Sequence, residues 1–160
     1  MSEKNEQRKW EREEVVILVT EYFRTKEMLP DIIDENYHRI SSILRIREMK
    51  ITGQPVSDIF RDYSGIRMQS GRIRCLDPDT DYNGMTGTKL QKEIVDEYLA
   101  NPEKISKEAT DVIRKYEWLW TLNIKARESL DISNEFEWVQ RSMKKYKWIW
   151  FDKNQNTCYH

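Results

Sequence analysis

The chain has 160 residues, of which 38% are hydrophobic and 34% are charged, and its formal net charge is -1. This size suits one domain or two small helical ones, and the balance is typical of amphipathic helices with solvated outer faces. A net charge near zero argues against a chain-wide electrostatic attraction to nucleic acid, so any DNA contact must be local. The polar first ten residues and the lack of a long apolar run indicate a cytoplasmic protein that does not contact a membrane.

Helical spacing of apolar residues predicts most of the N-terminal half. After a polar tail over residues 1–9, a first helix is expected from Trp10 to about Thr25. Pro30 interrupts the chain, and a second helix is expected toward Met49. A turn over residues 52–55 and a short third helical piece over residues 56–60 then lead to a basic segment.

The basic segment is FRDYSGIRMQSGRIRCL, residues 60–76. If a helix opens at Ser64 and Gly65, steps of about 100° bring Arg67 and Arg74 nearly into register, while Ile66, Ile73 and Leu76 turn toward a core. Two guanidinium groups on one face of a helix suit a phosphate backbone or a guanine edge. The segment therefore predicts a small nucleic-acid-binding surface.

Other residues near Arg67 and Arg74 either extend the predicted binding surface or could pair with its arginines. Ser70 and Gly71 keep the face small, and Arg72 adds charge more than a quarter turn away. Alternatively, the arginines only decorate a solvated face and pair with Asp58, Asp62 or Asp77.

The remaining chain is predicted to be mostly helical. Residues 77–87 are rich in turn formers, Thr88 is expected to cap a helix that ends at Asn101, and Pro102 is a candidate domain boundary. A long helix to about Ser129, a further helix after Ser133 and a short C-terminal β-hairpin should follow. The expected fold is a bundle of three to four helices over residues 10–101, followed by a helical segment with a hairpin over residues 102–160.

Aromatic and basic residues alternate near the C-terminus. Lys144, Lys145 and Lys147 lie among tryptophans and could bind nucleic acid. The rings more often belong to a core or to an interface, and a homo-oligomer could form through this Trp-rich half.

Neither catalysis nor a bound cofactor is predicted. Cys75 and Cys158 have no CxxC spacing, and His38 has no nucleophile at a predictable distance. The sequence DTDYNG at residues 79–84 matches the start of a calcium loop, but Leu90 occupies the position of the bidentate glutamate. We expect a protein that is not an enzyme, with no metal site.

The segments WEREEVVILVTEYF, FRDYSGIRMQSGRIRCLDP and GMTGTKLQKEIVDEYL together resemble a known arrangement. They are similar to the N-terminal helical, Myb/SANT-like domain that precedes HNH nuclease domains in bacterial restriction-type proteins. The resemblance covers residues 10–101 and implies a DNA-facing role in which Arg67, Arg72 and Arg74 match the basic segment. The histidines of an HNH centre have no counterpart here.

Two functions are therefore expected from different classes. The first is a non-enzymatic accessory module of restriction or mobile-element type that binds double-stranded DNA in a helix-turn-helix-like manner. The second is a small protein-interaction factor, such as a phage-encoded inhibitor of a bacterial defence nuclease, whose partner is a bacterial defence protein.

Overall fold

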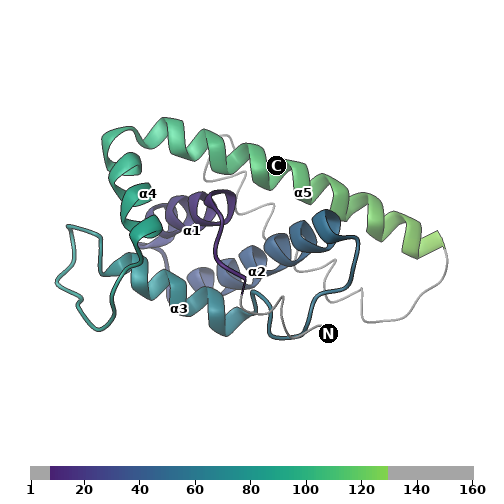
Figure 1. The fold of residues 1–160 in the computed structure, drawn as a ribbon, viewed down its shortest axis with the longest axis horizontal. Helices are drawn as coiled ribbons and strands as arrows, with labels where there is room; N and C mark the ends of the chain where they lie inside the picture. Colours follow the sequence, from purple (N-terminus) through teal and green to yellow (C-terminus); the bar gives the residue numbers. More distant parts are fainter. Residues whose placement is uncertain (1–7, 130–160) are drawn as a thin grey trace. The chain divides into compact units, whose positions relative to one another are not determined.

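The computed structural model describes the backbone of residues 8–129 and the side chains of residues 8–117 (Figure 1). The helices are α1 (Arg12–Thr25), α2 (Pro30–Thr52), α3 (Tyr63–Arg74), α4 (Lys89–Ala100) and α5 (Pro102–Ser129). The chain divides into two compact units, Met1–Glu117 and Trp118–His160. The mostly helical fold is confirmed, whereas the expected helix after Ser133 and the hairpin lie outside the described residues.

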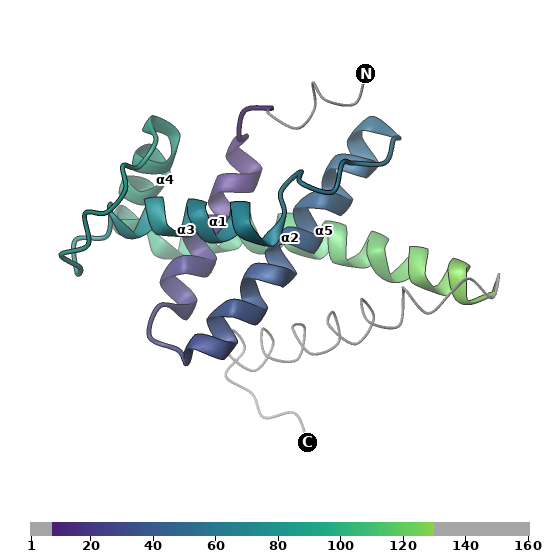
Figure 2. The ribbon, with the colours of Figure 1, turned by 90° about the horizontal axis from the view of Figure 1, so that it is seen from below.

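Helix α1 lies at the centre of the first unit. Residues Val15 to Val19 are all at most 2% exposed, as expected for a helix with neighbours on every side. Helices α2, α3 and α4 pack against α1, and Figure 2 shows α3 crossing both α1 and α2. The rest of the apolar core comes from Ile40, Ile43, Leu44, Phe60, Ile66, Ile73, Ile94, Val95, Ile105, Ala109, Val112, Ile113 and Tyr116.

Helix boundaries follow local capping chemistry. Thr88 caps α4 as expected: its side chain accepts from the backbone N of Gln91, whose side chain in turn accepts from the backbone N of Thr88. Asp62 caps α3 by accepting from the backbone N of Gly65 at 2.8 Å. The segment over residues 77–88 that joins α3 to α4 is an irregular loop, as its turn formers predicted.

The predicted third helical piece is wrong, because residues 58–61 form a turn. The backbone N of Phe60 donates to the carbonyl of Ser57, and Arg61 follows with a φ of 48°. The Arg45 side chain donates to the carbonyls of Ser57 and Phe60 at 2.8 and 2.6 Å. A segment of five residues is too short to form a stable helix, because the first helical turn is costly to nucleate. The Arg45 side chain instead satisfies the carbonyls of this segment.

The interior of the first unit contains ion pairs as well as apolar side chains. Glu21 accepts from Arg24 at 2.7 Å and from Arg39 at 2.6 Å, and both the Glu21 and Arg39 side chains are 1% exposed. Glu14, whose side chain is fully buried, pairs with Arg61 at 2.7 Å. Buried charges of this kind destabilise a fold when they lose their partners. Buried ion pairs thus join α1 to α2 through Glu21 and Arg39, and α1 to the turn before α3 through Glu14 and Arg61.

Candidate nucleic-acid interface

Helix α3 presents its arginines because of how it packs. Ile66 and Ile73 are 0% exposed and anchor one face of the helix against the core. Arg67 and Arg74, which are each one residue further along the chain, both fall on the exposed side. The predicted register of the two arginines and the inward orientation of both isoleucines are therefore confirmed.

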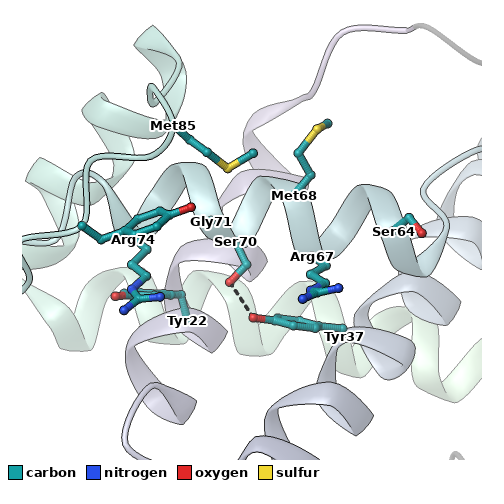
Figure 3. Close-up of a pocket in the computed structure, with 10 residues that line it drawn as sticks. Tyr22, Tyr37, Ser64, Arg67, Met68, Ser70, Gly71, Arg74 and Met85 are labelled. Carbon is teal, nitrogen blue, oxygen red and sulfur yellow. Dashed lines mark hydrogen bonds between the residues drawn. The ribbon is translucent and has the colours of Figure 1, made fainter.

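The exposed side of α3 forms one wall of a cleft with a volume of about 410 Å³. In Figure 3, Arg67 extends toward Tyr37 of α2, Arg74 extends toward Tyr22 of α1, and Met85 of the 77–88 loop lies beyond Gly71. We call this space the arginine cleft. Its lining residues are Tyr22, Tyr37, Ser64, Arg67, Met68, Ser70, Gly71, Arg74, Tyr82 and Met85.

Arg67 and Arg74 form no ion pair with any carboxylate among residues 8–117. Asp62 instead caps α3, and Asp77 accepts from Tyr22 and Lys26. Ion pairs do form at Arg8, Arg12, Arg24, Arg39, Arg47 and Arg61. The two arginines of the cleft therefore differ from these six, and they do not pair with the aspartates that the plainer explanation proposed.

Hydrogen bonds and ring contacts hold the aromatic side chains of the cleft. The Tyr22 hydroxyl donates to Asp77 at 2.8 Å, and the Tyr37 hydroxyl donates to the Ser70 hydroxyl at 3.2 Å. The Arg74 guanidinium lies 4.5 Å from the centre of the Tyr82 ring, a distance typical of a cation–π contact. These contacts orient the rings before any ligand binds.

The electrostatics of the cleft favour an anion. Burial raises the pKa of the Tyr22 hydroxyl, and its hydrogen bond to Asp77 raises it further, so Tyr22 stays neutral at physiological pH. Burial would also raise the pKa of Asp77, but hydrogen bonds from Lys26, the Asp79 backbone and Tyr22 hold it below its ordinary value. Asp77 is 2% exposed and its negative charge is balanced by Lys26 at 2.9 Å. The exposed charges that line the cleft are thus the two guanidinium groups.

The other predicted contact residues occupy different positions. Arg72 donates to the carbonyl of Thr86 at 2.7 Å and does not line the cleft. Ser70 lines the cleft but is 6% exposed, and its hydroxyl is already bonded to Tyr37. Gly71 lies beneath Met85. Lys144, Lys145 and Lys147 lie outside the described residues.

Sequence reasoning did not find the residues of the cleft that lie off α3. Tyr22 and Tyr37 belong to the apolar stripes of their helices, which suggested only a core, and Tyr82 lies in a loop defined by turn formers. Met68 and Met85 carried no signal of their own. A tyrosine at the end of an apolar stripe would have been the one hint, since its hydroxyl requires a polar partner when the ring is buried.

Gly87 of the 77–88 loop packs closely against the Leu76 side chain. A Cβ at Gly87 would lie 2.5 Å from Cδ1 of Leu76, which is too close for the side chain to accommodate without movement. Gly87→Ala should lower the free energy of unfolding by about 1–3 kcal/mol through overpacking, as measured by urea denaturation. Asn83→Ala, an exposed change in the same loop, should stay within about 0.5 kcal/mol of wild type. Equal stability of the two variants would contradict this account.

Asp79, which suggested a calcium loop, and His38, which suggested an acid–base role, each contact another side chain. Asp79 pairs with Lys26 at 3.1 Å, and the His38 ring stacks on Tyr63 with 4.4 Å between centres. Within the part of the chain that the structure describes, no group of three histidine, cysteine or acidic residues is placed to hold a metal ion. In the same part, no helix is both long and apolar enough to cross a membrane.

Comparison with known proteins identified no relative of this chain. No family model matches the chain, and no match was found among the curated proteins or the solved structures.

Proposed function

We propose that this protein is a non-enzymatic DNA-binding module of restriction or mobile-element type, which contacts the DNA backbone through Arg67 and Arg74. The observation that carries the proposal is that these two guanidinium groups share one face of α3 and have no carboxylate partner among residues 8–117. Arg67 and Arg74 are exposed, and no carboxylate among residues 8–117 neutralises them, so both charges are available to a ligand. Two guanidinium groups on one face, neither neutralised by a carboxylate, suit phosphate oxygens.

The charge of the chain limits how the module can bind. With a net charge of -1, it cannot rely on a diffuse positive surface, so a few local contacts must supply the affinity. Seven residues of helix separate the two arginines by about 10 Å along the axis, enough for each to contact a different phosphate. Binding should therefore be modest and strongly dependent on salt.

The test compares the wild-type chain with Arg67→Ala/Arg74→Ala by fluorescence anisotropy on a labelled 20-base-pair duplex, at several salt concentrations. The double variant should bind at least tenfold more weakly at low salt. The slope of log K against log salt should fall in magnitude by about 2, because roughly 0.9 of a counterion is released for each phosphate contact. Both substituted residues are exposed, so the fold should persist, and circular dichroism checks this.

A matched control removes the same charge elsewhere. Lys92 and Lys107 pair with Asp96 and Asp111 on exposed faces of α4 and α5, and neither lysine lines the cleft. Lys92→Ala/Lys107→Ala should bind DNA within about twofold of wild type and keep its stability, since exposed ion pairs of this kind are weak. Equal weakening by both double variants would point to net charge alone and reject the proposed interface.

The second candidate function, a protein-interaction factor such as an inhibitor of a bacterial defence nuclease, is favoured by the net charge of -1. Its partner would be bound whether or not DNA is present. Capture from a bacterial lysate with and without nuclease treatment separates the two functions, because a DNA-binding module loses its companions when DNA is digested.

A further inference from the structure

The side of α3 that carries Arg67 and Arg74 is recessed, which distinguishes it from a recognition helix that enters the major groove. In Figure 3, Tyr22 and Tyr37 lie on one side of the two arginines. Tyr82 and Met85 of the 77–88 loop also line the cleft. A helix that reads a major groove about 12 Å wide must instead project from the protein surface. The two arginines instead line a cleft together with side chains of α1, α2 and the 77–88 loop.

The size of the arginine cleft suits one small ligand. Its volume of about 410 Å³ lies near the lower end of the range of about 300–1,000 Å³ that is typical of small-molecule sites. A single nucleotide unit is a ligand of this class, whereas a stacked base pair with both its strands is not. On the proposed function, the part of the DNA that can enter is therefore one unpaired nucleotide.

The chemistry of the lining also suits a nucleotide. Tyrosine rings and the thioethers of Met68 and Met85 offer apolar surface to the flat face of a base, while Arg67 and Arg74 offer charge to its flanking phosphates. Tyr82 is the stacking candidate in the loop, because its ring is partly exposed and lies beside Arg74, whose guanidinium is 4.5 Å from the ring centre. Unpaired bases stack on tyrosine rings and arginine planes in this way.

The cleft is also prepared for binding. The hydroxyls of Tyr22 and Tyr37 are bonded to Asp77 and Ser70, so these two rings need no rearrangement. Preorganised rings lower the entropic cost of holding a ligand. Extruding a base from a fully paired duplex costs a few kcal/mol, a cost that is smallest where the base is already unpaired.

We infer that the arginine cleft receives one unpaired nucleotide, so that the protein prefers single-stranded or locally unpaired DNA to a fully paired duplex. This inference rests on the proposed DNA-binding function and narrows its substrate. The base lies against Tyr82 and the methionines, and Arg67 and Arg74 take phosphates on either side of it.

The test measures the binding of the full chain to three labelled DNAs at one salt concentration. They are a paired 20-base-pair duplex, the same duplex with one unpaired central nucleotide, and the single strand. The last two should bind at least tenfold more tightly than the paired duplex. Equal or tighter binding of the paired duplex would overturn the inference but leave the proposed function standing, whereas no binding to any of the three DNAs would overturn both.

Two variants of Tyr82 separate stacking from a general loss of structure. Tyr82→Ala should reduce the preference for unpaired DNA to less than threefold, while Tyr82→Phe, which keeps the ring, should retain most of it. A variant that was merely unstable would weaken all three DNAs equally and leave the ratio unchanged. Retention of the full preference in Tyr82→Ala would overturn the role of the ring.

A free deoxynucleoside monophosphate tests whether the ligand must be part of a strand. It offers one phosphate to two arginines whose Cα atoms are about 10 Å apart along the helix, so it should compete only at millimolar concentration. Displacement of the single strand at micromolar concentration would show a free nucleotide to be the ligand and would overturn the inference.

Discussion

Glu21→Gln is expected to lower the free energy of unfolding by about 3–5 kcal/mol, the range typical of removing one partner from a buried ion pair. The Glu21 carboxylate is shared by Arg24 and Arg39 at 2.7 and 2.6 Å, and the Glu21 and Arg39 side chains are 1% exposed. Glutamine preserves the shape but removes the charge that Arg24 and Arg39 share, while Arg39 keeps its ion pair with Glu117 at 3.2 Å. Urea denaturation followed by circular dichroism measures the loss.

Two comparisons show whether the buried pair is responsible. Asp96→Asn breaks the exposed pair with Lys92 and should cost less than about 1 kcal/mol. In a double-mutant cycle of Glu21→Gln with Arg39→Met, the double variant should be more stable than the sum of the two single losses predicts, by at least about 1 kcal/mol. Strict additivity would mean that Glu21 and Arg39 do not act as a pair.

Acid should unfold the first unit over a narrow range of pH. Burial would raise the pKa of Glu21, but the charges and hydrogen bonds of Arg24 and Arg39 outweigh burial and hold it below its ordinary value. In the same way Arg61 outweighs burial at Glu14, and Lys26 does so at Asp77. Each carboxylate is at most 2% exposed, and because its partners outweigh burial it is ionised in the folded protein near neutral pH.

The sign of the pH effect follows from these lowered pKa values. Below about pH 4.5 the unfolded chain takes up protons that the folded chain does not, so the free energy of unfolding falls as pH falls toward the folded-state pKa values. Each such proton contributes about 1.4 kcal/mol per pH unit, and three carboxylates acting together give a slope of up to about 4 kcal/mol per pH unit. Above about pH 5 the contribution of these groups should be constant.

The measurement is a series of urea denaturations from pH 3 to pH 6. The Glu21→Gln variant should be less stable than wild type at pH 6. On acidification its free energy of unfolding should fall less steeply, because it takes up about one proton fewer on unfolding. A wild-type stability that stays constant from pH 5 to pH 3.5 would contradict the proposed dependence on the three carboxylates.

The helices were predictable because their causes are local. Apolar spacing located α1, α2, α4 and α5, and the Thr88 cap identified the start of α4 within one residue. The false helix over residues 56–60 had the same apolar pattern over too few residues. The geometry of this segment depends on hydrogen bonds from Arg45 of α2. The neighbouring sequence does not predict these bonds, because Arg45 lies more than ten residues away.

The arginine face of α3 was also predictable, because the register of two residues on one helix follows from helical geometry alone. The cleft was not predictable, because Tyr22, Tyr37 and Tyr82 come from separate elements and meet only through packing. The absence of carboxylate partners for Arg67 and Arg74 among residues 8–117 was equally inaccessible, since Asp62 and Asp77 are close in sequence yet are engaged elsewhere.

The amino-acid sequence by itself determined that the chain is mostly helical and that Arg67 and Arg74 share a face of α3, since both properties depend on contacts within a few residues. Only the tertiary structure decided that this face is the wall of a tyrosine-lined cleft and that its arginines pair with no acid among residues 8–117. Those properties arise from α1, α2 and the 77–88 loop, whose positions beside α3 are set by burial of the core and by ion pairs between residues far apart in the chain.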